Sequence, residues 1–212
     1  MSDFEKAQHL LWAFKGDAYL YGPGVLAQLG GVVTSLRQRV ALVRDTFPGS
    51  DAFVDTIRDS VAEAGATLTA EITGAGPNAP REDLSRITDQ IKAADPDVIV
   101  SFGGGSTIDA TKAAEVLRTL GGEIDDYFGT GLVTQATQES GKALTPHVAI
   151  QTAASSGAHL TKYSNITDVS TGQKKLIVDQ AIVPVRPVFD YQVTYNAPYS
   201  LTADGALDGI AH

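Results

Sequence analysis

The stretch of residues 97–112, DVIVSFGGGSTIDATK, is the most informative part of this chain for its fold class. Its apolar beginning predicts a buried strand, residues 106–120 predict a helix, and three glycines join the two. Backbone N–H groups at the start of a helix carry partial positive charge, and glycines let an anion approach without meeting a Cβ. The stretch therefore predicts a phosphate-binding turn between a strand and a helix.

A simpler interpretation of the same glycines stays open. Gly103, Gly104 and Gly105 can serve only to make a tight strand-to-helix turn, because such turns are common in α/β domains. The spacing is neither GxGxxG nor GxxxxGK[ST], so it matches neither the usual dinucleotide fingerprint nor the nucleoside triphosphate loop. Asp109 and Lys112 share one helix face and are expected to pair.

Outward from this stretch, strand and helix patterns alternate along the chain. Strands are expected within 18–24, 39–45, 67–72, 97–102 and 147–152, a β-hairpin at 159–178, and helices around 53–61, 84–94, 106–120 and from 198 onward. Alternation of this kind implies βαβ units around a parallel sheet that is covered on both faces. The predicted fold class is α/β: a Rossmann-like parallel sheet flanked by helices, with an added β-hairpin.

Composition excludes several classes of protein. The chain has 212 residues, of which 43% are hydrophobic and 19% charged, so it can bury a core. A net charge of −9 argues against nucleic acid or an anionic membrane as a partner, and the lack of cysteine excludes disulfides and thiolate metal sites. No segment resembles a signal peptide or approaches the ~20 apolar residues of a membrane helix. A cytoplasmic protein is predicted.

Four further features carry candidate chemistry, each with a plainer alternative. Asp45 ends an early predicted strand, where an acidic side chain can hold a ribose hydroxyl or simply cap a turn. Asn78 lies in a Gly-Pro-Asn loop and suits a turn equally well. The segment QTAASSG (151–157) suits contact with a ring or a phosphate, or is an ordinary loop. Asp208 and His212 lie four residues apart on a predicted helix, so their side chains share a face. They can bind one metal ion together or simply be an ordinary surface pair.

Taken together, these motifs resemble the iron-containing (group III) alcohol dehydrogenase family along nearly the whole chain. GGGSTIDATK (103–112) is similar to the family's complete GGGSxxDxxK motif and is the most specific signal. YLYGPGVLAQLG (19–30), ALVRD (41–45), GPNAP (76–80) and TGQKKLIV (171–178) are similar to further family segments, in order. LTADGALDGIAH (201–212) resembles its T-x-x-G-x-D-x-x-x-H segment.

The resemblance implies an NAD-binding site, with NADP less favoured because Asp45 would hold the adenosine ribose. Gly103, Gly104, Gly105 and Ser106 would face the pyrophosphate, and Asp109 would lie near the nicotinamide. The implied further contacts are Thr152 and Ser156 in the cleft, and Asn78 with Lys174 or Lys175, the choice of lysine being open.

The resemblance also implies a catalytic Fe²⁺ or Zn²⁺ with Asp208 and His212 as its first two ligands. The metal would polarise the oxygen of an alcohol or aldehyde while NAD exchanges a hydride with it. On this basis residues 1–197 are expected to form the NAD(P)-binding domain. Residues 198–212 are expected to begin an all-helical metal-binding domain whose remainder is absent, so the chain is interpreted as the front part of a longer protein, inactive in isolation. The oligomeric state is left open, a homo-oligomer included.

The sequence departs from the family in the segment TAASSGAH (152–159), where TTAGTGSE is common. His159 stands where a glutamate is common, and we interpret it as a surface histidine on a hairpin rather than as a residue near the substrate. Two alternative functions stay open: an enzyme similar to glycerol dehydrogenase or dehydroquinate synthase, and a nucleotide-binding module without catalysis of its own.

Overall fold

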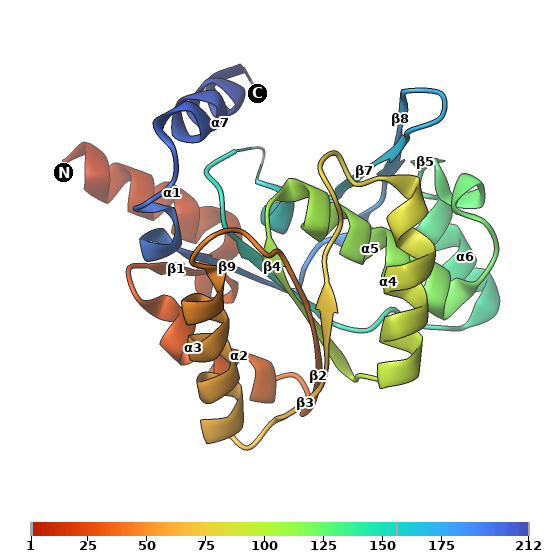
Figure 1. Ribbon diagram of the computed structural model, residues 1–212, viewed down its shortest axis with the longest axis horizontal. Coiled ribbons are helices and arrows are strands. Elements are labelled where there is room, and N and C mark those ends of the chain that lie inside the picture. Colours follow the sequence, from red (N-terminus) through yellow and green to blue (C-terminus); the bar gives the residue numbers. More distant parts are fainter. Residues whose placement is uncertain (1, 156, 212) are drawn as a thin grey trace.

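The computed structural model describes residues 2–155 and 157–211 and has a six-stranded parallel sheet at its centre (Figure 1). The strand order is β1-β9-β6-β4-β2-β3, and every neighbouring pair in this sheet is parallel. The strands are β1 (Leu20–Gly22), β2 (Arg39–Arg44), β3 (Thr67–Thr73), β4 (Val98–Gly103), β6 (His147–Gln151) and β9 (Arg186–Asp190).

Helices cover both faces of this sheet (Figure 1). The α-helices are α1 (Asp3–Lys15), α2 (Leu29–Thr34), α3 (Ser50–Glu63), α4 (Arg81–Ala94), α5 (Gly105–Leu120), α6 (Leu132–Ser140) and α7 (Tyr199–Ala211). Alternate residues of a strand point to opposite faces. Val40 and Leu42 of β2 therefore pack with α2 and α3, whereas Ala41 and Val43 pack with α4 and α5. The predicted α/β class is confirmed.

A small second sheet lies against α5. Its order is β5-β8-β7, with β5 (Gly129–Thr130), β7 (Tyr163–Asp168) and β8 (Gln173–Val178). β7 and β8 run antiparallel, which confirms the predicted hairpin. Short 3₁₀ turns complete the description at Gly16–Ala18, Val25–Gln28, Ile124–Tyr127 (η3), Ala158–Leu160 (η4), Gln180–Ile182 and Tyr191–Thr194 (η6).

The strand order places a topological switch point between β2 and β4. From β2 the chain leaves through α3 toward β3 on one side, and from β4 it leaves through α5 toward β6 on the other. α3 and α5 belong to the cores of opposite faces of the sheet. A crevice at the carboxyl ends of the strands is expected where such a reversal occurs, so the fold itself points to the ends of β2 and β4.

The described helices include none that is both long enough and apolar enough to cross a membrane.

Candidate nucleotide-binding site

The glycine turn lies at this switch point, between the end of β4 and the start of α5. Gly104 is the N-cap of α5, with an extended backbone (φ −73°, ψ −178°). The first N–H groups of a helix have no partner within the helix, so those of Gly105 and Ser106 point out from its start. The helix runs for 16 residues, long enough for an N-terminal dipole to favour an anion.

The glycines of the turn differ in what surrounds them. A Cβ on Gly103, which is the last residue of β4, would lie 2.7 Å from Asp45 Oδ2 and 2.8 Å from Thr107 Cβ. Gly103 is therefore required by packing beneath the turn. Among the described residues, a Cβ on Gly104 would meet only Asp45 Oδ2, at 3.9 Å, so its outer side is open.

A pocket of about 490 Å³ opens beside Gly104, across the carboxyl ends of β2, β3 and β4. Asp45 follows β2 directly and forms part of its wall. The described residues that line it are Arg44, Asp45, Thr46, Phe47, Thr73, Gly74, Ala75, Gly76, Pro77, Gly104 and Ser106. Predicted site residues from two distant parts of the chain, Asp45 and the glycine turn, thus meet at one cavity.

The Asp45 carboxylate is held at both oxygens. Oδ2 accepts the N–H of Gly104 at 2.9 Å, and Oδ1 accepts the hydroxyl of Thr107. Burial raises the pKa of Asp45, while these two hydrogen bonds act in the opposite direction by stabilising the ionised form. The N–H of Gly104 therefore already has an anionic partner in this chain, a contact that no sequence motif indicates.

Ser106, Asn78 and Lys174 form a connected polar chain beside the turn. The N–H of Asn78 donates to Ser106 Oγ at 2.9 Å, and Lys174 Nζ donates to Asn78 Oδ1 at 3.0 Å. Asn78 has a left-handed backbone (φ 65°), as asparagine tolerates. Lys175 instead contacts Asp125 at 2.5 Å and the ring of Phe128. The hairpin thus brings Lys174, and not Lys175, to Asn78.

Asp109 and Lys112 form a buried pair on the inner side of α5. Lys112 Nζ lies 3.6 Å from Asp109 Oδ1 and donates to the carbonyls of Ala158, Thr161 and Tyr163. Burial lowers the pKa of Lys112 to about 8, and burial raises the pKa of Asp109. With its ammonium surrounded by these acceptors, Lys112 fixes the segment after β6 to α5.

The segment after β6 contains the two remaining residues predicted to line a cleft, Thr152 and Ser156. The N–H of Thr152 donates to the carbonyl of Gly103 at 3.1 Å, which places the segment beside the glycine turn. Ser156 lies outside the described residues.

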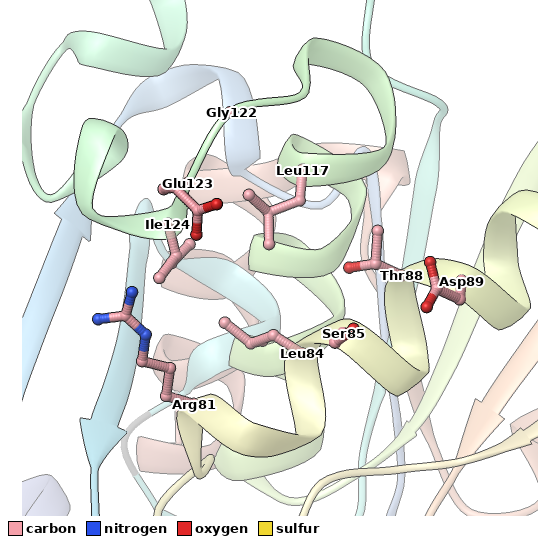
Figure 2. A pocket seen from close by; sticks show the side chains of 9 residues that line it. All are labelled: Arg81, Leu84, Ser85, Thr88, Asp89, Leu117, Gly122, Glu123 and Ile124. Atoms are coloured by element: carbon pink, nitrogen blue, oxygen red, sulfur yellow. The ribbon is translucent and has the colours of Figure 1, made fainter.

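A second pocket, of about 330 Å³, lies away from these residues, where α4, α5 and η3 meet (Figure 2). Figure 2 shows the side chains of Leu84, Leu117 and Ile124 around it, with Arg81 at its rim. Arg81 pairs with Asp125 at 2.5 Å. None of the predicted site residues that the structure describes lines this pocket, so it does not compete with the switch point as the candidate nucleotide site.

A match to a known protein family agrees with this geometry. Residues 17–191 match the family model described as iron-containing alcohol dehydrogenase. This chain belongs to that family. The resemblance found in the sequence motifs is therefore confirmed.

Individual relatives of this chain agree with that assignment. It is 34% identical over 131 residues to a sulfoacetaldehyde reductase of Bilophila wadsworthia, covering 62% of this chain and 32% of the relative. It is 29% identical over 196 residues to an NAD-dependent methanol dehydrogenase of Bacillus methanolicus, covering 92% and 49%. The solved structure of a 1,3-propanediol oxidoreductase superposes with a TM-score of 0.82 at 26% identity, covering 92% and 49%. The aligned parts cover less than half of each of these proteins, and the chain spans about half of their length.

The metal-ligand pair suggested by the family motif is only half described. Asp208 lies on α7, and His212 lies outside the described residues. Within the described part of the chain, no group of three or more His, Cys, Asp or Glu side chains is arranged to hold a metal ion. Catalytic zinc sites use three protein ligands, so the described residues do not by themselves make up such a site.

The interpretation of His159 as a surface histidine on a hairpin is wrong. His159 belongs to η4, is 4% exposed, and its Nε2 lies 2.9 Å from the hydroxyl of Tyr19. Its ring also lies against that of Phe189. Burial lowers the pKa of His159 to about 3, so the side chain is neutral and packs inside the protein beside β1 and β9.

Sequence reasoning also missed residues that shape the site. Thr107 lies at an unassigned position of the GGGSxxDxxK motif, and its contacts with Asp45 depend on strands distant in sequence. Gly74 and Gly76 line the pocket, and their signal was the glycine content of a segment interpreted only as a loop.

Proposed function

We propose that this chain binds NAD at the switch-point pocket and serves hydride transfer between NAD and an alcohol or aldehyde. The observation that carries the proposal is the convergence of Asp45 and the open start of α5 on one pocket of about 490 Å³. A helix start with glycines favours a pyrophosphate, and a carboxylate at the end of the second strand favours ribose hydroxyls. The family and the named NAD-dependent relative support the same cofactor.

Each residue has a proposed role. Gly105 and Ser106 offer backbone N–H or hydroxyl groups to the pyrophosphate, Gly104 faces it with an open outer side, and Gly103 lets the turn pack closely beneath it. Asp45 accepts hydrogen bonds from the adenosine ribose and repels a 2′-phosphate, so NAD is preferred to NADP.

Further proposed contacts are secondary. Asn78 and Lys174 extend the polar wall; Lys174 is preferred to Lys175 because it bonds to Asn78. Asp109 is the proposed contact near the nicotinamide end, and Thr152 and Ser156 are proposed contacts in the cleft.

The metal-dependent half of the function is proposed from family membership. Asp208 and His212 would be the first ligands of Fe²⁺ or Zn²⁺, and residues 198–212 would begin the helical domain that completes the site beyond the NAD-binding residues 1–197. Such an ion supplies Lewis acidity toward the substrate oxygen. A small alcohol or aldehyde is the proposed substrate.

The test is a fluorescence titration of the folded chain with NADH, using Gly104→Val as the diagnostic variant. Since the Gly104 backbone is extended and a Cβ has room in the pocket, the substitution is expected to leave the fold intact. The added side chain would occupy the space of the pyrophosphate, so NADH affinity should fall at least about tenfold.

Gly31→Val is the matched control, because a Cβ on Gly31 meets no atom within 4 Å and Gly31 lies in α2, away from the pocket. Equal NADH affinity in the Gly104→Val and wild-type chains would refute binding at this turn. Absence of NADH binding by the folded wild-type chain would refute NAD binding by this chain.

A further inference from the structure

Thr107 joins three segments that converge at the candidate nucleotide site. It lies in the first turn of α5 and is fully buried. Its Oγ1 accepts the N–H of Ala75, from the loop after β3, at 3.1 Å. The same oxygen donates its proton to Oδ1 of Asp45, which follows β2.

The direction of these hydrogen bonds is fixed by the number of protons available. A threonine hydroxyl has a single proton to donate, and the N–H of Ala75 can only donate toward it. The hydroxyl proton is therefore free to go to Asp45, whose second oxygen accepts the N–H of Gly104 at 2.9 Å. With both oxygens accepting, the two hydrogen bonds favour the ionised form of the carboxylate and hold it in one orientation.

Two glycines make room for this arrangement. A Cβ on Gly103 would lie 2.8 Å from Thr107 Cβ, and a Cβ on Gly74 would lie 2.8 Å from Thr107 Cγ2. Any larger residue at either position would displace the Thr107 side chain. The backbone of β4 and of the loop after β3 is thus shaped around Thr107 and Asp45 together.

We propose that Thr107 is a positioning residue that sets the Asp45 carboxylate for discrimination between NADH and NADPH. The proposal rests on the proposed NAD site. A carboxylate tied at both oxygens cannot turn away from a 2′-phosphate, so its charge opposes NADPH fully, and its free lone pairs stay aimed at ribose hydroxyls. Without the Thr107 bond the carboxylate can rotate, and both effects weaken.

Few other charged groups surround Asp45, so the effect of Thr107 on the pKa of Asp45 can be measured. Arg44, the neighbouring charged residue on the pocket wall, is already paired with Asp51 at 2.7 Å and Glu71 at 2.8 Å. The loop of residues 73–77 and the start of α5 up to Ile108 contain no titratable side chain. Burial is the main influence that raises the pKa of Asp45, and Thr107 is the main side chain that opposes it.

The first experiment measures the titration of the Asp45 side-chain carboxyl by ¹³C NMR in the ligand-free chain. Thr107→Val removes the hydroxyl with little change of shape, and it should raise the pKa of Asp45 above the wild-type value. Thr107→Ser keeps the hydroxyl and should restore the wild-type titration. Thr107→Ala provides a second removal of the hydroxyl should the valine variant fail to fold. An unchanged Asp45 titration in the variants without the hydroxyl would overturn the proposal.

The second experiment measures dissociation constants for NADH and NADPH by fluorescence. Thr107→Val should lower the preference for NADH about tenfold, the usual scale of one hydrogen bond to a charged group. In an Asp45→Ala background the same substitution should leave the preference unchanged, because Thr107 acts through Asp45. Retained NADH binding with an unchanged preference in Thr107→Val would overturn this inference alone. Failure of the wild-type chain to bind either nucleotide would overturn the proposed function, and the selectivity role with it.

Discussion

At the scale of single residues, buried carboxylates organise this chain by accepting backbone N–H groups. Asp190, at the end of β9, is 2% exposed. Its Oδ1 accepts the N–H groups of Gly24 and Gln192, each at 2.9 Å, and its Oδ2 accepts that of Leu26 at 3.0 Å. One side chain thus ties the turn after β1 to the start of η6.

Asp190→Asn should therefore destabilise the chain by about 2–3 kcal/mol, because an amide nitrogen would face a backbone donor in a buried place. Urea unfolding measures the change. Asp168→Asn is the matched control: Asp168 accepts three hydrogen bonds through Oδ1 alone in the exposed hairpin turn, and asparagine keeps an oxygen there. Similar losses in the two variants would contradict the role given to Asp190.

At the scale of elements, β9 is a strand that the sequence pattern did not predict. β9 lies between β1 and β6 inside the sheet, yet it contains Pro187, and a proline argues against an interior strand. The strand is short, and Pro187 is paired in register with Ala149. The amphipathic helices α3 and α4, by contrast, are predicted from their apolar spacing, because that spacing is present in the sequence whatever the helix packs against.

The placement of α7 depends on a glycine. A Cβ on Gly205 would lie 2.7 Å from the carbonyl carbon of Ala154, so Gly205→Ala should detach α7 from the segment after β6. Hydrogen exchange across residues 199–211 should accelerate at least about tenfold. A Cβ on Gly209, one turn later, would meet no atom of the described residues within 4 Å, so Gly209→Ala should instead slow exchange slightly through better helix propensity. Equal exchange in the two variants would show that α7 does not dock through Gly205.

At the scale of the whole molecule, two histidines make stability depend on pH. His147 begins β6 with its Nε2 2.7 Å from Ser101 Oγ, and His159 packs against Tyr19. Burial lowers the pKa of each to about 3, with a smaller contribution from Lys112. Since the unfolded chain binds protons on both from about pH 6.5 downward, folding stability is present above that pH and is lost as pH falls.

Between pH 7 and pH 5 the two histidines should lower the free energy of unfolding by about 4 kcal/mol in total. Urea unfolding at the two pH values measures this loss. His159→Phe keeps a ring in the aromatic cluster and should halve the loss of unfolding free energy between pH 7 and pH 5. His9→Gln, on the exposed part of α1, should leave that loss unchanged. Equal stability of the wild-type chain at pH 5 and pH 7 would rule out buried neutral histidines.

Local patterns in the amino-acid sequence were enough to predict the α/β class, the hairpin and the glycine turn. The class follows from the apolar periodicity, the hairpin from its turn residues, and the glycine turn from an uninterrupted motif. They also singled out Asp45 and Asn78 as candidates. The folded arrangement was needed to see that Asp45 bonds to Gly104 and Thr107, that Lys174 rather than Lys175 reaches Asn78, and that His159 is buried. These facts depend on strand order and side-chain direction, which bring together residues far apart in the chain, and no local pattern records such contacts.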